Sequence, residues 1–417
     1  MPIRMRRREI LPLLLAPGAA LAAAPKLKIT GLKTLVVDAF RCNWVFVKIT
    51  TDQGLTGLGE GTTEMNELTV EAAIRNMSRY LVGKDPFAVE YHTHILRRES
   101  YWRNGVILRS ALAAVEAALL DIKGKALGVP VYELLGGRYR DRIKCYANGW
   151  FTGANRPEEF AAKAAATVQQ GFQALKFDPF GKAYLTMSPA EQEMAVARVA
   201  AVREAVGPRV DILVEAHGRL DVPTAVAMGQ RLAPLRPLFY EEPVLPENLR
   251  SLAEVKRGMP LAVATGERFY DVERFQEALR LGAVDYLQPD VIHVGGMLET
   301  KRVCSLGLVE DRPVSAHNPN GPVCNAMTLQ IAASTPNFVM LETVVTDVPW
   351  RKDVVREDLE IIDGEMVIPD KPGLGLELNE TEAAKHPYVP HDLRHYTGAL
   401  TAIRPPDAAP YWRLGRP

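Results

Sequence analysis

The sequence predicts an α/β protein whose main part is a closed barrel of eight parallel strands, each followed by a helix. Three observations favour this fold. From about Lys144 the chain repeats a short apolar segment, a loop and a helical pattern. The 417 residues are long enough for a barrel of roughly 250 residues and a second lobe. Three apolar segments also end in a glutamate at equal intervals, at Glu215, Glu241 and Glu267.

The first 25 residues have the composition of an export signal. "MPIRMRRREILPLLLAPGAALAAAP" has a basic start, an apolar stretch and small residues suited to cleavage. Ala20–Ala22 predicts a cleavage site, and Arg7-Arg8 followed by Ile10-Leu11 resembles a twin-arginine signal. We therefore expect a signal peptide at 1–22 and a periplasmic or secreted protein, or a cytoplasmic one if the leader does not function.

Composition argues against several classes of partner. Fifty basic residues balance fifty acidic ones, and no basic block carries interleaved aromatics, so nucleic acid is not expected. After signal cleavage no stretch reaches the roughly 18 apolar residues that a membrane span needs. Scattered cysteines without a C-x-x-C pair predict free, buried thiols, at Cys42, Cys145, Cys304 and Cys324.

Residues 26–143 are expected to form an α+β capping lobe. "FRCNWVFVKITTDQGLTGLGEG" holds two β-rich runs joined by a turn at 52–54, which predicts a hairpin. A helical section follows from about 64 to 127, with Leu112, Val115, Leu119 and Ile122 on one face of its best helix. Loops at 41–44 and 97–105 are expected to cover the barrel mouth and select the substrate.

Residues 144–345 are expected to form the barrel. Its candidate strands are "KCYANG", "ALKFD", "DILVEA", "LFYEEP", "LAVATGE", "DYLQPD", "RPVSAH" and "FVMLE". Ser188–Glu191 combines an N-cap serine, a first-turn proline and a capping-box glutamate, and Gly207 follows the end of that helix. Residues 346–417 are rich in turns and prolines, and we expect this tail to pack back on the capping lobe.

The three glutamates predict a metal site. Because they recur once per strand–helix unit, three neighbouring strands place a carboxylate at the same C-terminal mouth, where barrel enzymes keep their active sites. Three carboxylates would repel one another there unless a divalent cation neutralised them. Oxygen-only ligands favour Mg²⁺ over zinc.

Two histidines and two further acids extend this pattern. His217 lies two residues beyond Glu215, and strand alternation would point it to the same face. His317 ends the seventh strand beside Asp290, which ends the sixth, so the pair is interpreted as an oriented general base. Glu342 ends the eighth strand and could polarise an oxyanion if it is protonated. For each, the alternative is an ordinary residue of the barrel rim.

Together these residues resemble the enolase superfamily, and within it the mandelate racemase subgroup with its galactonate dehydratase-like sugar-acid dehydratases. The barrel segments that carry the resemblance are "FYEEPV", "ATGERF", "LQPDVIHVGG" and "AHNPNGP". Others are "NWVFVKITTDQGLTGLGE", "DIKGKALGVPVYELLGG" and "KPGLGLEL". The resemblance implies a modified TIM barrel, a capping domain completed by the C-terminal tail, and a homo-oligomer of two or eight copies.

The resemblance also implies a reaction. One Mg²⁺ per subunit on the three glutamates would bind the carboxylate of a sugar acid, an aldonate such as galactonate or gluconate. His317 would remove the proton next to that carboxylate, and the metal would stabilise the enediolate. His217 would then protonate the departing β-hydroxyl, which gives a 2-keto-3-deoxy acid.

Two departures from the family pattern leave alternatives open. The first metal ligand is often Asp in these relatives and is Glu215 here. Where racemases carry Lys-x-Lys, the chain reads Lys176–Asp178, which disfavours a lysine base. A His217/His317 pair could still racemise or epimerise a hydroxy acid, and a silent exported binding protein is the alternative outside enzymes. Candidate substrate contacts are Lys176, Asp178 and Arg219.

Overall fold

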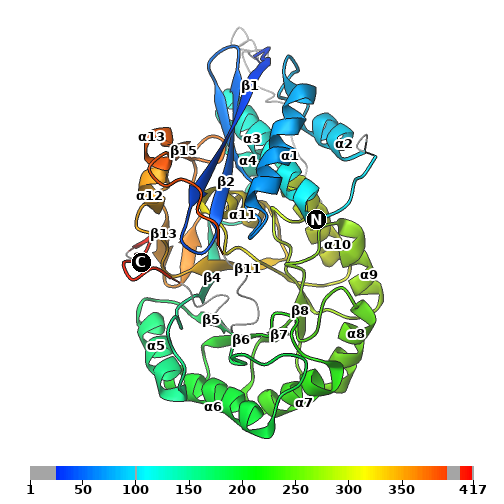
Figure 1. Cartoon of the computed structure of the whole chain (residues 1–417), viewed down its shortest axis with the longest axis vertical. Helices are drawn as coiled ribbons and strands as arrows, with labels where there is room; N and C mark the ends of the chain where they lie inside the picture. Colours follow the sequence, from blue (N-terminus) through cyan, green and yellow to red (C-terminus); the bar gives the residue numbers. More distant parts are fainter. Residues whose placement is uncertain (1–24, 99–100, 392–403, 416–417) are drawn as a thin grey trace, which may run out of the picture.

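Figure 1 shows the computed structural model, in which a barrel ringed by helices lies below a smaller lobe of strands and helices. The structure describes residues 25–98, 101–391 and 404–415. The signal peptide predicted at 1–22 lies outside this range.

The capping lobe is an antiparallel sheet packed on helices. Its elements are β1 (Ile29–Asp38), β2 (Asn43–Thr51), β3 (Thr56–Glu60), α1 (Glu67–Leu81), α2 (Val89–Arg98), α3 (Val106–Leu127) and α4 (Val131–Leu134). The predicted hairpin is confirmed as β2–β3. β1 pairs with β2 as a third strand that the sequence analysis did not identify, because only two of its ten residues are buried and its apolar pattern is weak.

Helix α3 is the centre of this lobe. Its predicted apolar face is buried, and so is most of the rest of the helix. Gly57 and Gly59 let β3 contact α3 backbone to backbone, because a Cβ on either glycine would lie 1.9 Å from a carbonyl oxygen of the helix, that of Ala118 or Ala114. The sheet and the helix therefore form one tightly packed unit.

All eight predicted barrel strands are confirmed. They are β4 (Arg142–Asn148), β5 (Ala174–Phe177), β6 (Asp211–Glu215), β7 (Phe239–Glu241), β8 (Val263–Thr265), β9 (Tyr286–Leu287), β10 (Val314–Ala316) and β11 (Phe338–Val344). Each is parallel to the next, and β11 pairs back with β4, which closes the barrel. The C-terminal ends of all eight strands therefore meet at one mouth.

Helices surround the strands on the outside (Figure 1). They are α5 (Pro157–Gln169), α6 (Pro189–Val206), α7 (Val222–Leu232), the 3₁₀ turn η1 (Ala233–Leu235), α8 (Leu249–Gly258), α9 (Val272–Arg280), α10 (Met297–Val309) and α11 (Pro322–Ser334). The capping box predicted for α6 is confirmed, since Ser188 accepts from the backbone N–H of Glu191 and Glu191 accepts from that of Ser188. Gly207 ends the helix with a φ of 74°.

The tail contacts both lobes. It contains α12 (Arg351–Val354), β12 (Val355–Arg356), β13 (Glu360–Ile362), β14 (Glu365–Val367), β15 (Glu377–Leu378), α13 (Glu380–Ala383) and β16 (Arg413–Leu414). On the capping lobe, Glu380 pairs with Lys33 and Lys48. On the barrel, β14 pairs antiparallel with β4. This second contact was not predicted, because strands of two or three residues leave no periodic pattern.

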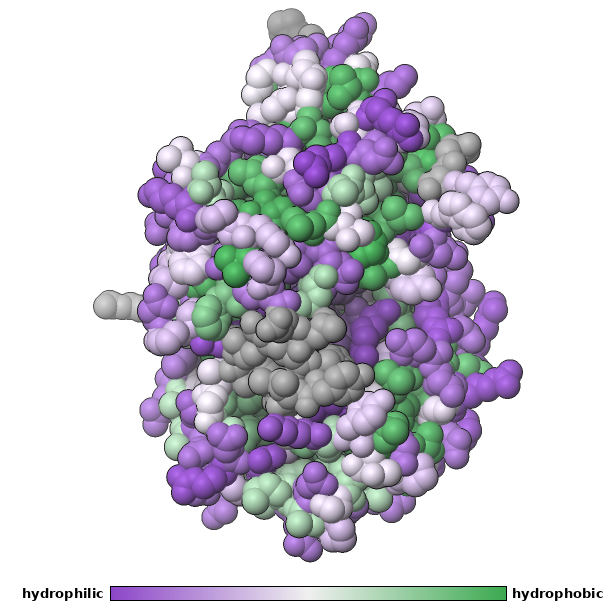
Figure 2. All heavy atoms as spheres, in the orientation of Figure 1, coloured by the Kyte–Doolittle hydropathy of each residue, from purple (hydrophilic) through white to green (hydrophobic). Residues whose placement is uncertain are grey.

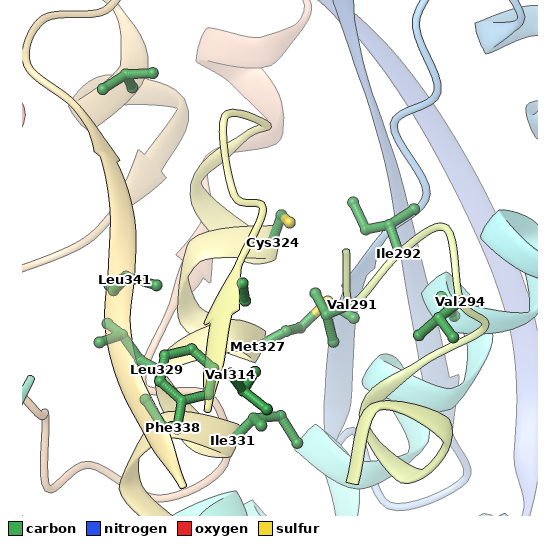
Figure 3. Close-up of a cluster of buried hydrophobic side chains, with 14 of the residues drawn as sticks. Val291, Ile292, Val294, Val314, Cys324, Met327, Leu329, Ile331, Phe338 and Leu341 are labelled. Atoms are coloured by element: carbon green, nitrogen blue, oxygen red, sulfur yellow. The ribbon is translucent and has the colours of Figure 1, made fainter. Parts of the chain in front are cut away.

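Apolar packing holds the strands that end at the mouth. Figure 3 shows Val314 of β10 beside Phe338 and Leu341 of β11, with Met327, Leu329 and Ile331 of α11 packed against them. Val291 and Ile292, which follow Asp290, belong to the same core. The backbone on both sides of Asp290 and His317 is thus buried in a close-packed interior.

Two predictions about chemistry and surface can be compared with the fold. The four cysteines are free and buried, as expected. Over the described residues no helix combines the length and apolarity needed to cross a membrane. Figure 2 shows hydrophobic side chains in patches separated by hydrophilic ones on the face in view.

Candidate active site

The three predicted metal ligands lie together at the barrel mouth. Glu215 ends β6 and Glu241 ends β7, and the two are register partners, while Glu267 follows β8. One carboxylate oxygen from each lies within 4.8 Å of the other two. Equal spacing along the chain therefore becomes adjacency in space, as the sequence predicted.

This cluster fits a hard divalent cation. Oε2 of Glu215 and Oε2 of Glu241 are buried and accept no hydrogen bond from the described residues. Burial and the neighbouring Glu241 carboxylate raise the pKa of Glu215 well above its ordinary value. Burial would also raise the pKa of Glu267, but the charges of His317 and Arg268 outweigh it and lower that pKa. Unpartnered oxygens, mutual repulsion and an all-oxygen donor set are the conditions that Mg²⁺ satisfies.

Lys176 is the cation that the fold itself places in this cluster. Its Nζ lies 3.0 Å from Oε1 of Glu241, 3.2 Å from Oε1 of Glu342 and 3.5 Å from Oε2 of Glu215. Those carboxylates overcome the effect of burial and raise the pKa of Lys176 well above its ordinary value. This one ammonium faces three carboxylates, and the fourth, that of Glu267, lies beside Arg268 and His317.

His317 is oriented by a carboxylate, as expected. Its Nδ1 donates to Oδ2 of Asp290 at 2.7 Å, and Asp290 also accepts from the amide of Asn320 at 2.9 Å. Burial would raise the pKa of Asp290, yet its histidine neighbours lower it, so the carboxylate is ionised and can only accept. Nε2 of His317 is left facing Oε2 of Glu267 at 3.4 Å.

The charge on His317 depends on the metal-site acid beside it. Burial alone would lower the pKa of His317, but the Glu267 charge and the Asp290 hydrogen bond raise it to about 9. A cation bound to Glu267 would cancel the first of these two effects. Such a cation would therefore lower the pKa of His317 and favour its neutral form.

His217 lies at the mouth, but on a turn and not on an extension of the strand as predicted. β6 ends at Glu215, and His217 lies in a turn with a φ of 51°, so strand alternation does not orient it. Its backbone N–H donates to Oε1 of Glu215 at 2.6 Å. A non-glycine residue in the left-handed region is strained, and such strain gathers at functional sites.

Asp178 and Arg219 support His217. Oδ2 of Asp178 accepts from Nδ1 of His217 at 2.9 Å and from Nη2 of Arg219, while Oδ1 accepts from the backbone of Phe180 at 2.9 Å. Arg219 also donates to the carbonyls of Ala216 and Gly181. Asp178 and Arg219 thus bind each other, and Asp178 orients the imidazole of His217. The expectation that these two side chains contact the substrate stays a prediction.

Glu342 has cationic neighbours, which argue against the protonated form considered from the sequence. Burial would raise its pKa, but Lys176 and His317 outweigh burial and lower it. Its carboxylate also accepts from Asn148 at 2.6 Å, from the backbone of Asn318 at 2.9 Å and from the hydroxyl of Tyr146 at 3.2 Å. Glu342 therefore adds a fourth carboxylate to the site, beside Lys176.

Several residues of this site were missed from the sequence. His293 lies with Asp290 and His317 in a second group of close ligand atoms, and its Nδ1 is 3.1 Å from the carbonyl oxygen of Glu267. Glu242, with a φ of 37°, pairs with Arg268. His293 and Asn320 stand within the quoted segments "LQPDVIHVGG" and "AHNPNGP", which were the available signal.

The two capping-lobe loops expected at the mouth behave differently. Arg41 donates to the carbonyl of Pro319, two residues beyond His317, so the first loop does reach the mouth. Arg97 instead pairs with Glu273 of α9 and Glu299 of α10 on the outer ring of helices. The expectation that the loop at 97–105 selects the substrate stays a prediction.

Comparisons with known proteins agree with this geometry. The enolase C-terminal domain-like family model matches residues 159–382, and the N-terminal domain model of mandelate racemase/muconate lactonizing enzyme matches residues 23–136. D-galactonate dehydratase of Variovorax paradoxus (strain S110) is 38% identical over 379 residues, which cover 88% of this chain and 97% of that protein. D-gluconate dehydratase of Thermoproteus tenax is 35% identical, over 84% of this chain and 71% of that protein.

Solved structures show the same fold. A member of the enolase superfamily from Salmonella Typhimurium superposes with a TM-score of 0.82 at 30% identity, over 87% of this chain and 98% of that chain. A mandelate racemase/muconate lactonizing enzyme from Sulfitobacter sp. gives a TM-score of 0.81 at 32% identity, over 87% of this chain and 96% of that chain.

Proposed function

We propose that this chain, which belongs to the mandelate racemase/muconate lactonizing enzyme family of the enolase superfamily, dehydrates an aldonate in a reaction that requires Mg²⁺. Its similarity to the dehydratases above shows that it is a sugar-acid hydro-lyase. The substrate class is a polyhydroxy acid such as galactonate or gluconate. The product is a 2-keto-3-deoxy acid.

One observation carries the proposal. Two imidazoles, each oriented by its own aspartate, flank a cluster of three glutamates that could hold a metal ion. His217 follows the third barrel strand and His317 the seventh, and in a closed barrel of eight strands these positions lie on opposite sides of the mouth. Removal of a proton and departure of a hydroxyl need a base and an acid at separate places around one substrate.

Each histidine then has a defined proton position. Asp290 accepts from Nδ1 of His317, so Nε2 is the atom that takes the proton next to the substrate carboxylate. Asp178 accepts from Nδ1 of His217, so Nε2 is the atom that donates a proton to the departing β-hydroxyl. Lys176, beside Glu215 and Glu241, can bind a carboxylate oxygen of the substrate.

Glu215, Glu241 and Glu267 would hold the Mg²⁺. When bound, the ion would supply a Lewis acid that stabilises negative charge developing on the substrate carboxylate. The buried strand ends and the hydrogen bond from Asn148 to Glu342 keep the side chains around this cluster in place.

A panel of aldonic and aldaric acids tests the proposal. The purified chain, with Mg²⁺, is incubated with each acid, and a 2-keto-3-deoxy product is detected with a carbonyl reagent. We expect one or a few aldonates to be dehydrated and the activity to vanish in His317→Asn. The exposed His94→Asn is the matched control and should retain activity. Activity in His317→Asn equal to that of the wild type would overturn the assignment of the base.

The same two histidines favour one alternative, epimerisation of a hydroxy acid. A base and an acid on opposite sides of a substrate can remove a proton from one face and return it to the other. ¹H NMR in D₂O separates the two reactions. Exchange or inversion at the carbon next to the carboxylate, without a keto product from any acid in the panel, would assign epimerisation instead.

A further inference from the structure

A cavity in the capping lobe lies apart from the barrel mouth. It has a volume of about 380 Å³ between α1, α2 and the start of α3, elements that lie at the upper right of Figure 1. Its polar lining includes four arginines: Arg79, Arg97, Arg103 and Arg109. No acidic residue is among the described residues that line it.

Arg109 is the innermost of these arginines. Its side chain is only 2% exposed, and its Nε and Nη1 are buried with no hydrogen-bond acceptor among the described residues. Among the described residues its one ion pair is with Glu299, whose Oε2 lies 3.9 Å from Nη1. That carboxylate already binds Arg97 at 2.9 Å and also binds Arg302. Buried guanidinium donors without acceptors are costly, so a second anion beside Arg109 would supply hydrogen bonds that Glu299, at this distance, does not.

The other side chains add positive charge and apolar surface. Arg79 stacks on the ring of Tyr80, and no described carboxylate pairs with Arg79 or Arg103. Tyr80 and Tyr101 line the cavity at exposed positions. Apolar side chains complete the lining: Ile95, Leu96, Leu108 and Leu112. Positive charge inside an apolar and aromatic wall suits an anion carried on an apolar group.

We propose that this cavity is a binding site for a small organic anion, in which a carboxylate or phosphate group pairs with Arg109 and a ring-sized apolar group lies against the tyrosines and leucines. The planar guanidinium offers parallel donors that match either group. The volume falls in the range of small-molecule sites. The proposal is independent of the proposed dehydratase reaction, because none of the lining residues belongs to the barrel mouth.

Isothermal titration calorimetry of the full chain tests it, with benzoate and phenyl phosphate as probes and inorganic phosphate as the ligand that lacks a ring. We expect saturable one-to-one binding of at least one ring-bearing probe, and weaker binding of inorganic phosphate. Arg109→Met, which keeps the side-chain volume, should weaken binding by roughly tenfold or more. The exposed Arg209→Met, on the loop before β6, is the matched control and should bind as the wild type does.

A second variant protects the test against misfolding of Arg109→Met. Arg103 is exposed and forms no described ion pair, so Arg103→Glu should fold normally and repel the anion. The proposal fails if no probe binds the wild type, or if a folded Arg109→Met or Arg103→Glu binds as tightly as the wild type. It also fails if no probe binds and Arg109→Met converts an oligomer of the wild-type chain into smaller species. The cavity would then serve contacts between copies of the chain.

Discussion

The two histidines at the barrel mouth acquire their roles from the carboxylates behind them. Asp290 and Asp178 are ionised, with pKa values below the ordinary range despite burial, because cationic neighbours outweigh the cost of burial. Each aspartate binds Nδ1 of one imidazole and thereby orients the ring. Replacing the carboxylate of either aspartate by an amide is therefore enough to change the tautomer of the histidine that it binds.

Asp178→Asn tests the support of His217. The amide cannot hold the imidazole cation as the carboxylate does, so we expect the rate of dehydration to fall about a hundredfold. Exchange of the α-proton in D₂O, which depends on His317, should change little. Kinetics and NMR exchange are measured on the same preparations, with Asp211→Asn at the opposite end of β6 as control. An equal fall in both rates would show that Asp178 supports the site as a whole.

The pKa of His317 provides a test of the metal site. Without a cation we expect a pKa of about 9, above the value of 6.5 for an unperturbed histidine. The coupling to Glu267 therefore stabilises the fold fully below pH 6.5, and this contribution is lost as the pH rises through 9. Saturating Mg²⁺ should lower the pKa, because it neutralises Glu267.

Histidine NMR titrations with and without Mg²⁺ measure this shift. Glu267→Gln should lower the pKa of His317 without any metal, and Mg²⁺ should then have little further effect. A pKa that is the same with and without Mg²⁺ in the wild type would contradict binding of the ion at Glu267.

At the scale of elements, the most constrained contact is that between β3 and α3. Two glycines of β3 bring the strand against helical carbonyls at a distance that no side chain allows. The helix in turn is buried over most of its length, so it cannot move away without opening the capping lobe. The close approach depends on glycine at both positions.

Gly59→Ala should therefore destabilise the protein strongly. Its Cβ would meet the carbonyl oxygen of Ala114 at 1.9 Å, and a backbone atom cannot rotate away, so we expect a loss of about 3 kcal/mol in the free energy of unfolding. Urea unfolding measures the loss. Gly31→Ala on β1 is the control, because its nearest neighbour is the hydroxyl of Thr50 at 3.3 Å. Similar stabilities for the two variants would contradict the argument.

At the scale of the whole molecule, one carboxylate joins the two lobes. Glu60, the last residue of β3, accepts from the backbone N–H groups of Gly321 at 2.8 Å, Cys324 at 2.9 Å and Val323 at 3.0 Å. These groups form the start of α11, where a negative charge is favourable. The segment from His317 to Asn320 leads directly into this helix, so the capping lobe helps to position the proposed base.

Glu60→Ala should affect stability and catalysis together. Three buried N–H groups would lose their acceptor, so we expect the free energy of unfolding to fall by about 3 kcal/mol and the rate of proton abstraction to fall with it. Glu60→Gln keeps one acceptor oxygen and should lie between the wild type and Glu60→Ala. Glu71→Ala, whose partners all lie in the capping lobe, is the control. A loss of stability with unchanged proton exchange would separate the two roles.

The sequence by itself determined the barrel, its eight strands, the cluster of three glutamates and the Asp290–His317 pair. These features follow from local periodicity and from position at a strand end, which adjacent residues encode. Closure of the barrel then converts equal spacing into proximity. The β2–β3 hairpin and the α6 capping box were predicted for the same local reason.

Only the tertiary structure decided the partners of these groups. The support of His217 by Asp178 and Arg219, the cationic neighbours of Glu342, the position of Lys176 and the place of His293 depend on contacts between segments far apart in the chain. His217 and Glu242 also have positive φ angles, which no strand pattern in the sequence predicts. A charge state is set by burial and by neighbours from several strands at once, and this information exists only after the chain has folded.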